Sequence, residues 1–265
     1  MTVMAASQRF RVLTYNIQVA IGTRRLHHYV TRGWRHVLPF RQRLANLDRT
    51  GAVLEDFDLV ALQEVDGGSY RGEFLNQAEY LAERARFSTW WMQVNRDYGA
   101  LAQHGIALLS HHEPSSVDEV RLPGVLPGRG VLVARFGEGD NALVVLVVHL
   151  ALGYRTRQLQ INRLARLVRG ERNVIVMGDM NCTAGELRAN PRLRTTGMQV
   201  VTGDLLTYPS WRPRRNLDHV LISPRLECES ASVLDLQLSD HLPVAVDLRL
   251  PGDVELPPFK ANPAG

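Results

Sequence analysis

Acidic, amide and histidine side chains recur in this chain directly after short apolar runs, where buried strands would end. At any single position the ordinary explanation is a turn, because Asp and Asn side chains hydrogen-bond the neighbouring backbone. Repetition after several apolar runs instead favours one polar cleft that the strand ends share. The residues concerned are Asn16, Glu64, Asp179, Asn181, Asp240 and His241.

Two other kinds of chemistry are disfavoured by the residues present. The two cysteines, Cys182 and Cys228, do not stand in the paired spacing that suggests a zinc site or a disulfide framework. No serine occupies the GxSxG context of a nucleophile elbow, which disfavours a Ser/His/Asp hydrolase.

Short β-branched or apolar runs predict many strands for a chain of this length. They cover residues 11–17, 59–65, 106–109, 131–136, 142–149, 174–177, 217–222 and 244–250. Apolar residues at helical spacing predict helices over residues 40–57, 74–85 and 158–168. Some strands follow one another without an intervening helix, so a purely parallel sheet is not expected. Two mixed sheets packed face to face, with helices outside, accommodate both observations.

Six motifs stand in order along the chain, namely TYN, LQEV, VVHL, GDMN, NLDH and SDHLPV. Each is weak alone, but the ordered series resembles that of the endonuclease/exonuclease/phosphatase superfamily over residues 11–247. The resemblance implies an α/β fold of the deoxyribonuclease I type, a four-layer sandwich of two mixed β-sheets flanked by helices. It also implies an enzyme, a metal-dependent phosphoric ester hydrolase with its site at one edge of the sheets.

The resemblance assigns the metal side of this site to three residues. Glu64 is expected to be the principal metal ligand with Asn16 beside it, and Asp240 completes the metal side directly or through water. The expected cofactor is Mg²⁺ or Mn²⁺, because hard oxygen donors suit both ions.

The remaining motif residues are expected to perform the acid–base and phosphate-binding steps. By resemblance, Asp179 orients or deprotonates the attacking water, and Asn181 donates to the phosphate. His241 contacts the scissile phosphate, and Asp218 keeps it charged. His149 resembles the histidine of the deoxyribonuclease I, sphingomyelinase and inositol-phosphatase branches. It would supply the leaving-group proton or bind a phosphoryl oxygen, although a lone histidine ending a strand is more often structural.

Basic and aromatic side chains near the motifs are candidate substrate contacts. Arg129 precedes a predicted strand and resembles a basic position of many relatives. Arg35 lies in the basic, aromatic-bearing segment 19–39, which would overhang the site from the end of the first strand. Trp211, Arg212, Arg214 and Arg215 stand just before Asp218 of the NLDH motif, where the arginines could hold a substrate backbone. For each of them the alternative is packing or solubility alone.

Composition favours an anionic substrate. The formal charge is +4, the sequence pI is about 9.4, and every basic residue except Lys260 is an arginine. Together with the tryptophans, this favours an endonuclease-like phosphodiesterase acting on nucleic acid, although arginine excess also follows from genome composition. Phospholipid or inositol phosphate is the alternative substrate, because arginine recognises those phosphates equally well. A non-catalytic binding module is disfavoured, because none of the six motif residues named first is missing.

Length and composition bound the domain organisation. A chain of 265 residues with 45% hydrophobic content predicts one domain over residues 1–250, followed by a poorly ordered proline-rich tail, 251–265. The N-terminus lacks a basic region followed by a long apolar stretch, and no run approaches the roughly 20 apolar residues that span a bilayer. We therefore expect a cytoplasmic protein without stable membrane insertion, and nothing in the sequence indicates an obligate protein partner.

Overall fold

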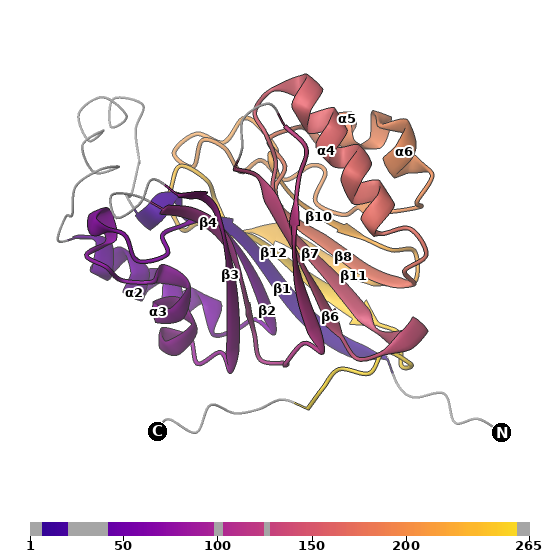
Figure 1. The fold of residues 1–265 in the computed structure, drawn as a ribbon, viewed down its shortest axis with the longest axis horizontal. Helices are drawn as coiled ribbons and strands as arrows, with labels where there is room; N and C mark the ends of the chain where they lie inside the picture. The colour runs from indigo at the N-terminus through magenta and orange to yellow at the C-terminus, as the bar shows by residue number, and fades with distance from the viewer. Residues whose placement is uncertain (1–6, 21–41, 98–102, 125–127, 259–265) are drawn as a thin grey trace.

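Two six-stranded β-sheets form the centre of the molecule, with helices outside them (Figure 1). The computed structural model describes residues 7–20, 42–97, 103–124 and 128–258. The first sheet contains β1 (Gln8–Asn16), β2 (Leu59–Val65), β3 (Thr89–Asp97), β4 (Gln103–Ser110), β11 (Glu227–Val233) and β12 (Val244–Leu250), in the order β11-β12-β1-β2-β4-β3. The second contains β5 (Ser116–Arg121), β6 (Gly130–Phe136), β7 (Leu143–His149), β8 (Asn173–Asp179), β9 (Gln199–Val200) and β10 (Asp218–Ile222), in the order β5-β6-β7-β8-β10-β9.

Both sheets are mixed. In the first, β1 runs parallel to β2, and in the second, β7 runs parallel to β8. The other strand pairs of the described residues are antiparallel. Parallel neighbours end at the same edge of a sheet, so β1 and β2 deliver their last residues side by side, and β7 and β8 do the same. The fold class expected from the sequence is therefore confirmed.

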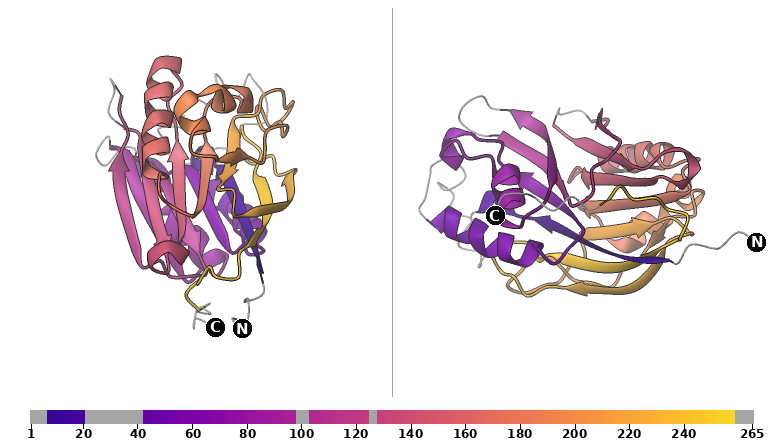
Figure 2. Two further views of the ribbon diagram at one scale, coloured as in Figure 1. Left: turned by 90° about the vertical axis from the view of Figure 1, so that its right-hand side faces the viewer. Right: turned by 90° about the horizontal axis from the view of Figure 1, so that it is seen from below.

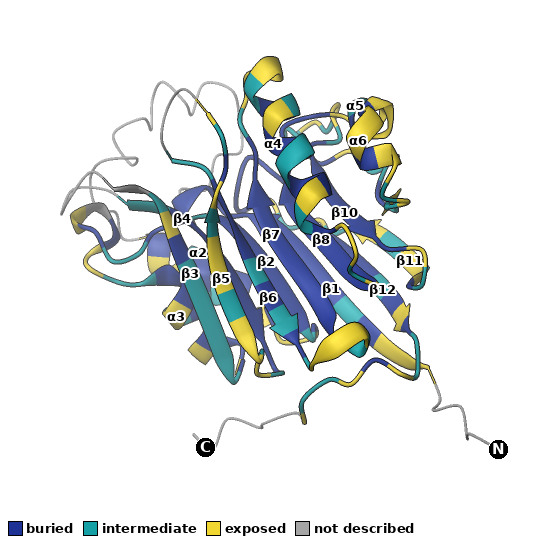
Figure 3. Cartoon of the chain, turned by 45° about the vertical axis from the view of Figure 1, so that its right-hand side comes forward, coloured by how far each residue is buried: buried dark blue, intermediate teal, exposed yellow. Residues whose placement is uncertain are grey.

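Side chains of the central strands are buried on both faces, which explains why these strands are apolar throughout. One set of alternating residues, including Val12, Leu59 and Val145, fills the layer between the sheets. The other set, including Leu13 and Val144, faces the outer helices. Figure 3 shows the result, with the central strands dark blue and the outward faces of the helices yellow.

Helices cover the outer face of each sheet (Figure 2). The first sheet carries α2 (Gln42–Leu54) and α3 (Gln77–Arg84), which pack on it through residues such as Leu47 and Leu81. The second carries α4 (Tyr154–Leu167), α5 (Ala184–Ala189) and α6 (Pro191–Arg194), packed through Ile161, Leu164 and Leu187. Among the described residues, no helix is both long and apolar enough to cross a membrane.

The predicted strands correspond to β1, β2, β4, β6, β7, β8, β10 and β12, and the three predicted helices to α2, α3 and α4. The strands that the sequence did not predict are β3, β5, β9 and β11, which are the four sheet edges. Edge strands have fewer covered faces, so they lack the continuous apolar run on which the prediction depended. β5 and β11, for example, contain no fully buried residue.

The start of the proline-rich segment 251–265 packs against the domain. Val254 is buried among the side chains between the two sheets. Asp253 pairs with Arg225 at 2.8 Å, and His112 Nδ1 lies 2.6 Å from the carbonyl oxygen of Pro257. Residues 259–265 lie outside the described residues.

Gly178 pairs with Val148 of β7 and directly precedes Asp179 on β8. Its φ is +145°, and a Cβ atom added to it would lie 2.0 Å from the carbonyl oxygen of Val148. Both the backbone conformation and the space therefore require glycine.

We expect Gly178→Ala to lower the free energy of unfolding by about 3 kcal/mol, because strained backbone and overlap with β7 add together. Gly185→Ala is the matched control, since the nearest atom to an added Cβ there lies at 3.8 Å. Urea unfolding followed by tryptophan fluorescence measures both changes. Wild-type stability in Gly178→Ala would contradict the proposed close approach.

Candidate active site

The register of the second sheet aligns three of the motif residues. His149 at the end of β7 pairs with Asp179 at the end of β8. Asp218 begins β10 and lies opposite Asp179 on the other side. Three neighbouring strands therefore present His149, Asp179 and Asp218 in one row at the edge of the sheet.

The first sheet presents its polar residues at the facing edge. Asn16 ends β1 and pairs with Gln63, so it lies next to Glu64 on β2. Asp240 and His241 precede β12, whose antiparallel pairing with β1 places Val244 opposite Thr14. Segments far apart in the sequence thus meet where β1 and β2 end.

A β-bulge orients Glu64. The pairing of β2 with β4 shifts between Gln63 and Val65, and Glu64 has a φ of 55°. A bulge of this kind re-aims a side chain that an ordinary strand would point elsewhere. Glu64 consequently lines the cleft, with 30% of its side-chain surface exposed.

The carboxylate of Asp179 connects the two sheets. Asn16 Nδ2 donates to Asp179 Oδ2 at 3.1 Å, and His149 Nε2 lies 3.5 Å from the same oxygen. The other oxygen, Oδ1, accepts the backbone N–H of Asn181 at 2.9 Å. Asp179 is almost fully buried, so these contacts replace its lost hydration.

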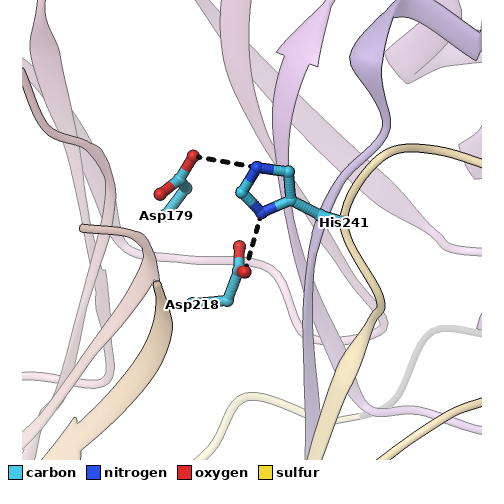
Figure 4. Close-up of side chains that lie close together, drawn as sticks. All are labelled: Asp179, Asp218 and His241. Atoms are coloured by element: carbon cyan, nitrogen blue, oxygen red, sulfur yellow. Dashed lines mark hydrogen bonds and ion pairs between the residues drawn. The ribbon is translucent and has the colours of Figure 1, made fainter. Parts of the chain in front are cut away.

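His241 stands between two carboxylates (Figure 4). Its Nδ1 lies 2.8 Å from Asp218 Oδ2, and its Nε2 lies 3.8 Å from Asp179 Oδ2. Thr207 Oγ1 also donates to Asp218 Oδ2, at 2.5 Å, while the ring of Tyr208 lies 4.9 Å from the imidazole. The expected pairing of His241 with Asp218 is present.

These surroundings shift the pKa of the ionisable groups. Burial disfavours the charged imidazole, but Asp218 and Asp179 outweigh it and raise the pKa of His241 well above its usual value. Burial, opposed by His241 and reinforced by Asp218, raises the pKa of Asp179 to about 7. His241 is therefore a cation at neutral pH, while Asp179 is poised to take up a proton.

His149 and Asn181 complete the wall of the cleft. His149 Nε2 lies 4.0 Å from Glu64 Oε1, so the imidazole stands between residues of both sheets. Asn181 has a φ of 51°, and its Nδ2 donates to the carbonyl of Leu150 at 3.0 Å. One amide proton of Asn181 is used in this bond, which fixes the side chain and leaves the second proton for a ligand.

The residues present fit a hard divalent cation. Desolvation by burial and the nearby charge of Asp240 raise the pKa of Glu64, so the Asp240 carboxylate opposes the ionisation of Glu64 in the same cleft. A cation between them would remove this opposition. The amide oxygen of Asn16 accepts the N–H of Gln18 at 3.1 Å and keeps one lone pair.

Asp179, Asp218 and His241 form a second cluster, whose ligand atoms lie within 4.8 Å of one another. The imidazole of His241 is held protonated by its two carboxylate neighbours, and a protonated nitrogen has no lone pair for a metal. Asp218 Oδ1, however, is buried and has no hydrogen-bond partner among the described residues. Oxygen donors of the kind that suit a divalent ion therefore lie on both sides of the cleft.

Of the residues predicted to contact the substrate, some line the cleft and others do not. Arg129 lines the cleft together with Glu64 and His149. Trp211 is half-buried and Arg212 is exposed, and neither lines the cleft. Arg35 lies outside the described residues.

Three cleft residues were not predicted from the sequence: Leu152, Tyr208 and Leu217. Arg215, one of the arginines that precede the NLDH motif, also lines the cleft. Tyr208 belongs to the stretch that leads into the NLDH motif and Leu217 to the motif itself, so their nearness to motif residues was the available signal. Leu152 follows His149 by three residues and carries no chemical signature. The cleft that these residues line has a volume of about 190 Å³.

A buried arginine ties together the loops that follow β7 and β8. Arg157 on α4 donates from Nη1 to the carbonyl oxygens of Ala151 and Leu152, at 3.1 and 2.6 Å. Its Nε and Nη2 bind both oxygens of Glu186 on α5, at 2.9 and 3.0 Å. The first loop begins directly after His149 and the second contains Asn181, so Arg157 is a positioning residue for both.

The chain matches the endonuclease/exonuclease/phosphatase family over residues 13–241. It therefore belongs to this family and is a metal-dependent phosphoester hydrolase. A comparison with curated protein sequences finds no match.

Solved structures of the same fold cover nearly the whole chain. An endonuclease/exonuclease/phosphatase from Beutenbergia cavernae is 21% identical with a TM-score of 0.68, covering 92% of this chain and 72% of its own. The mannosyl-6-phosphatase of Bacteroides thetaiotaomicron is 16% identical with a TM-score of 0.64, covering 90% and 99%. A 2′,3′-cyclic phosphatase, ANGEL2, is 15% identical with a TM-score of 0.64, covering 93% and 97%.

Replacing Asp218 tests the charge state of His241. Asp218→Asn removes the carboxylate that favours the charged imidazole, so the pKa of His241 falls. The charged form is then lost at a lower pH, and the descending limb of the pH–rate profile moves to lower pH. We also expect about a hundredfold loss of kcat.

The pH dependence of phosphoester hydrolysis measures both effects. Asp204→Asn, at an exposed position, is the control and should keep the wild-type profile. An unchanged profile in Asp218→Asn would show that the hydrogen bond does not set the charge of His241.

Arg157→Ala leaves Glu186 without its buried partner and two carbonyl groups without a donor. We expect a loss of about 3 kcal/mol in the free energy of unfolding, because breaking a buried ion pair leaves an uncompensated charge. Chemical denaturation checks this, with Arg155→Ala on the exposed face of the same helix as control. Equal stability of the two variants would refute the bridging role.

Proposed function

We propose that the protein is a phosphodiesterase that cleaves nucleic acid. The observation that carries this proposal is that the cleft continues on both sides of Glu64, Arg129 and His149. One arm leads to Tyr208 and Arg215, and the other leads to Asn95 and His104. A diester carries a group on each side of its phosphorus atom, and each group then has its own arm.

Charge along the cleft supports a polyanionic substrate. Arg129 stands at the junction of the two arms, and Arg215 lines the first of them. Arg212 and Arg214 are exposed on the loop that contains Arg215. Guanidinium groups bind phosphate oxygens through paired hydrogen bonds, so this series suits a sugar–phosphate backbone.

Each step of hydrolysis has a candidate group. Asp179, whose pKa is near 7, accepts a proton from the water as its oxygen attacks phosphorus. His241, as a cation, stabilises the negative charge that develops on the phosphoryl oxygens. The bond from phosphorus to the leaving oxygen breaks, and that oxygen takes a proton from His149.

Glu64, Asn16 and Asp240 are the groups that would hold Mg²⁺ or Mn²⁺. A divalent ion supplies charge stabilisation for the phosphoryl group and the leaving oxygen. The contribution of the chain is the bulge at Glu64 and the carboxylate of Asp240 facing it, which fix the donors before the ion binds.

A phospholipid or inositol phosphate is the second candidate substrate, and one observation favours it. Leu152 lines the cleft and is 77% exposed, and Tyr154 nearby is 62% exposed. Apolar side chains at a cleft mouth suit a lipid or a sugar ring as well as a base.

We expect metal-dependent cleavage of single-stranded DNA or RNA that is lost with a chelator. Glu64→Gln should lower kcat at least about a hundredfold, because the carboxylate that would hold the divalent ion is replaced by a neutral, weaker donor. Glu119→Gln, at an exposed position of the edge strand β5, is the matched control.

The assay compares plasmid, single-stranded DNA, RNA, sphingomyelin and a phosphatidylinositol phosphate, with magnesium or chelator. Cleavage of only the lipid substrates would replace the proposed substrate and keep the site. Nucleic-acid cleavage that survives in Glu64→Gln would refute the assignment of the site itself.

A further inference from the structure

The second arm of the cleft is a pocket of about 110 Å³. It shares Glu64, Arg129 and His149 with the reactive centre, and its far wall consists of Asn95, His104, Gly105 and Gly128. None of these four far-wall residues takes part in the hydrolytic steps described above. The arm therefore has a wall of its own, built mainly by β3 and β4.

Two β-bulges flank Gly105 on β4. On one side, the pairing with β2 shifts so that Glu64 is the extra residue opposite Ile106 and Gly105. On the other side, the pairing with β3 shifts between Val94 and Arg96, which makes Asn95 the extra residue. Bulges beside a site re-aim side chains, and here Glu64 and Asn95 are re-aimed into the same pocket.

Glycines keep the space for this arrangement. A Cβ added to Gly105 would lie 2.5 Å from the carbonyl oxygen of Gln93. A Cβ added to Gly130, in the other sheet, would lie 2.6 Å from Asn95 Oδ1. The side chain of Asn95 therefore lies against bare backbone of the second sheet and spans the gap between the sheets.

The pocket wall offers hydrogen-bond donors and a positive charge. Asn95 carries an amide NH₂, His104 an imidazole, and Arg129 a guanidinium group. Among the described residues that line the pocket, only Glu64, at the junction with the reactive centre, is acidic. None of them has an aromatic six-membered ring or indole on which a base would stack. This chemistry suits an anionic oxygen group better than a nucleobase.

We propose that Asn95 and His104, together with Arg129, bind the phosphate adjacent to the scissile one. This inference rests on the proposed action on nucleic acid. The subsite holds the backbone through the neighbouring phosphate, while Glu64 and His149 face the phosphate that is cleaved. Asn95 and His104 would then favour polynucleotides over esters with a single phosphate.

Dinucleotides with and without a terminal phosphate test the subsite. The dinucleotide TpT has one phosphodiester and no neighbour, whereas pTpT and TpTp add a phosphate on one side or the other. Chromatography of the products gives kcat/KM for cleavage of the internal diester. In the wild type, one of the two terminal phosphates should raise kcat/KM at least about tenfold, as expected for a hydrogen bond to a charged group.

Variants distinguish loss of this subsite from a general loss of activity. Asn95→Ala and His104→Gln should lose most of the tenfold gain from the terminal phosphate. Val94→Ala, on the exposed side of the same strand, should keep the gain. Each variant is characterised by the ratio of kcat/KM between substrates with and without the terminal phosphate. Partial unfolding lowers both values equally, so it does not change this ratio.

Two outcomes would overturn the inference in different ways. If polynucleotides are cleaved but TpT, pTpT and TpTp react at equal rates, or if the gain survives in Asn95→Ala and His104→Gln, the subsite is refuted and the nuclease function stands. If the wild type cleaves neither dinucleotides nor polynucleotides, the proposed function fails, and the subsite fails with it.

Discussion

The carboxylate of Asp179 is the contact on which the geometry of the site depends. It comes from β8 of the second sheet and accepts a hydrogen bond at 3.1 Å from Asn16 at the end of β1 in the first. The same oxygen lies within 3.8 Å of a nitrogen of both His149 and His241. A small sliding of one sheet over the other would separate all these groups at once. The packing of the core between the sheets therefore fixes the relative positions of the groups in the site.

Burial gives the site its charge pattern as well as its shape. The polar residues lie at the ends of strands that are apolar on both faces, so little water reaches them. Under these conditions a neighbouring charge acts strongly, and His241 becomes a cation between Asp179 and Asp218. The backbone strain at Glu64 and Asn181 is offset by the packed strands that carry them.

The rims of the cleft differ in chemistry from its centre. The centre holds the residues of the family motifs, and the fold is common to structures that are 15 to 21% identical to this chain. The rims consist of Leu152, of the loop with Tyr208 and Arg215, and of the β3–β4 wall with Asn95. Loops and edge strands tolerate change without disturbing the core, so substrate preference can vary there.

The family, the two mixed sheets and the motif residues can be predicted from the sequence, because central strands and their polar ends are local patterns that burial imposes on the chain. The four edge strands were not predicted from the sequence, since their residues are not enclosed on all sides. Three features emerge only in the folded chain: Asn95 faces the same pocket as Glu64, Arg157 bridges two loops, and Gly178 must lack a side chain. Each of these depends on which atoms of a distant segment lie opposite, and that is fixed only when the strands pair and the sheets pack.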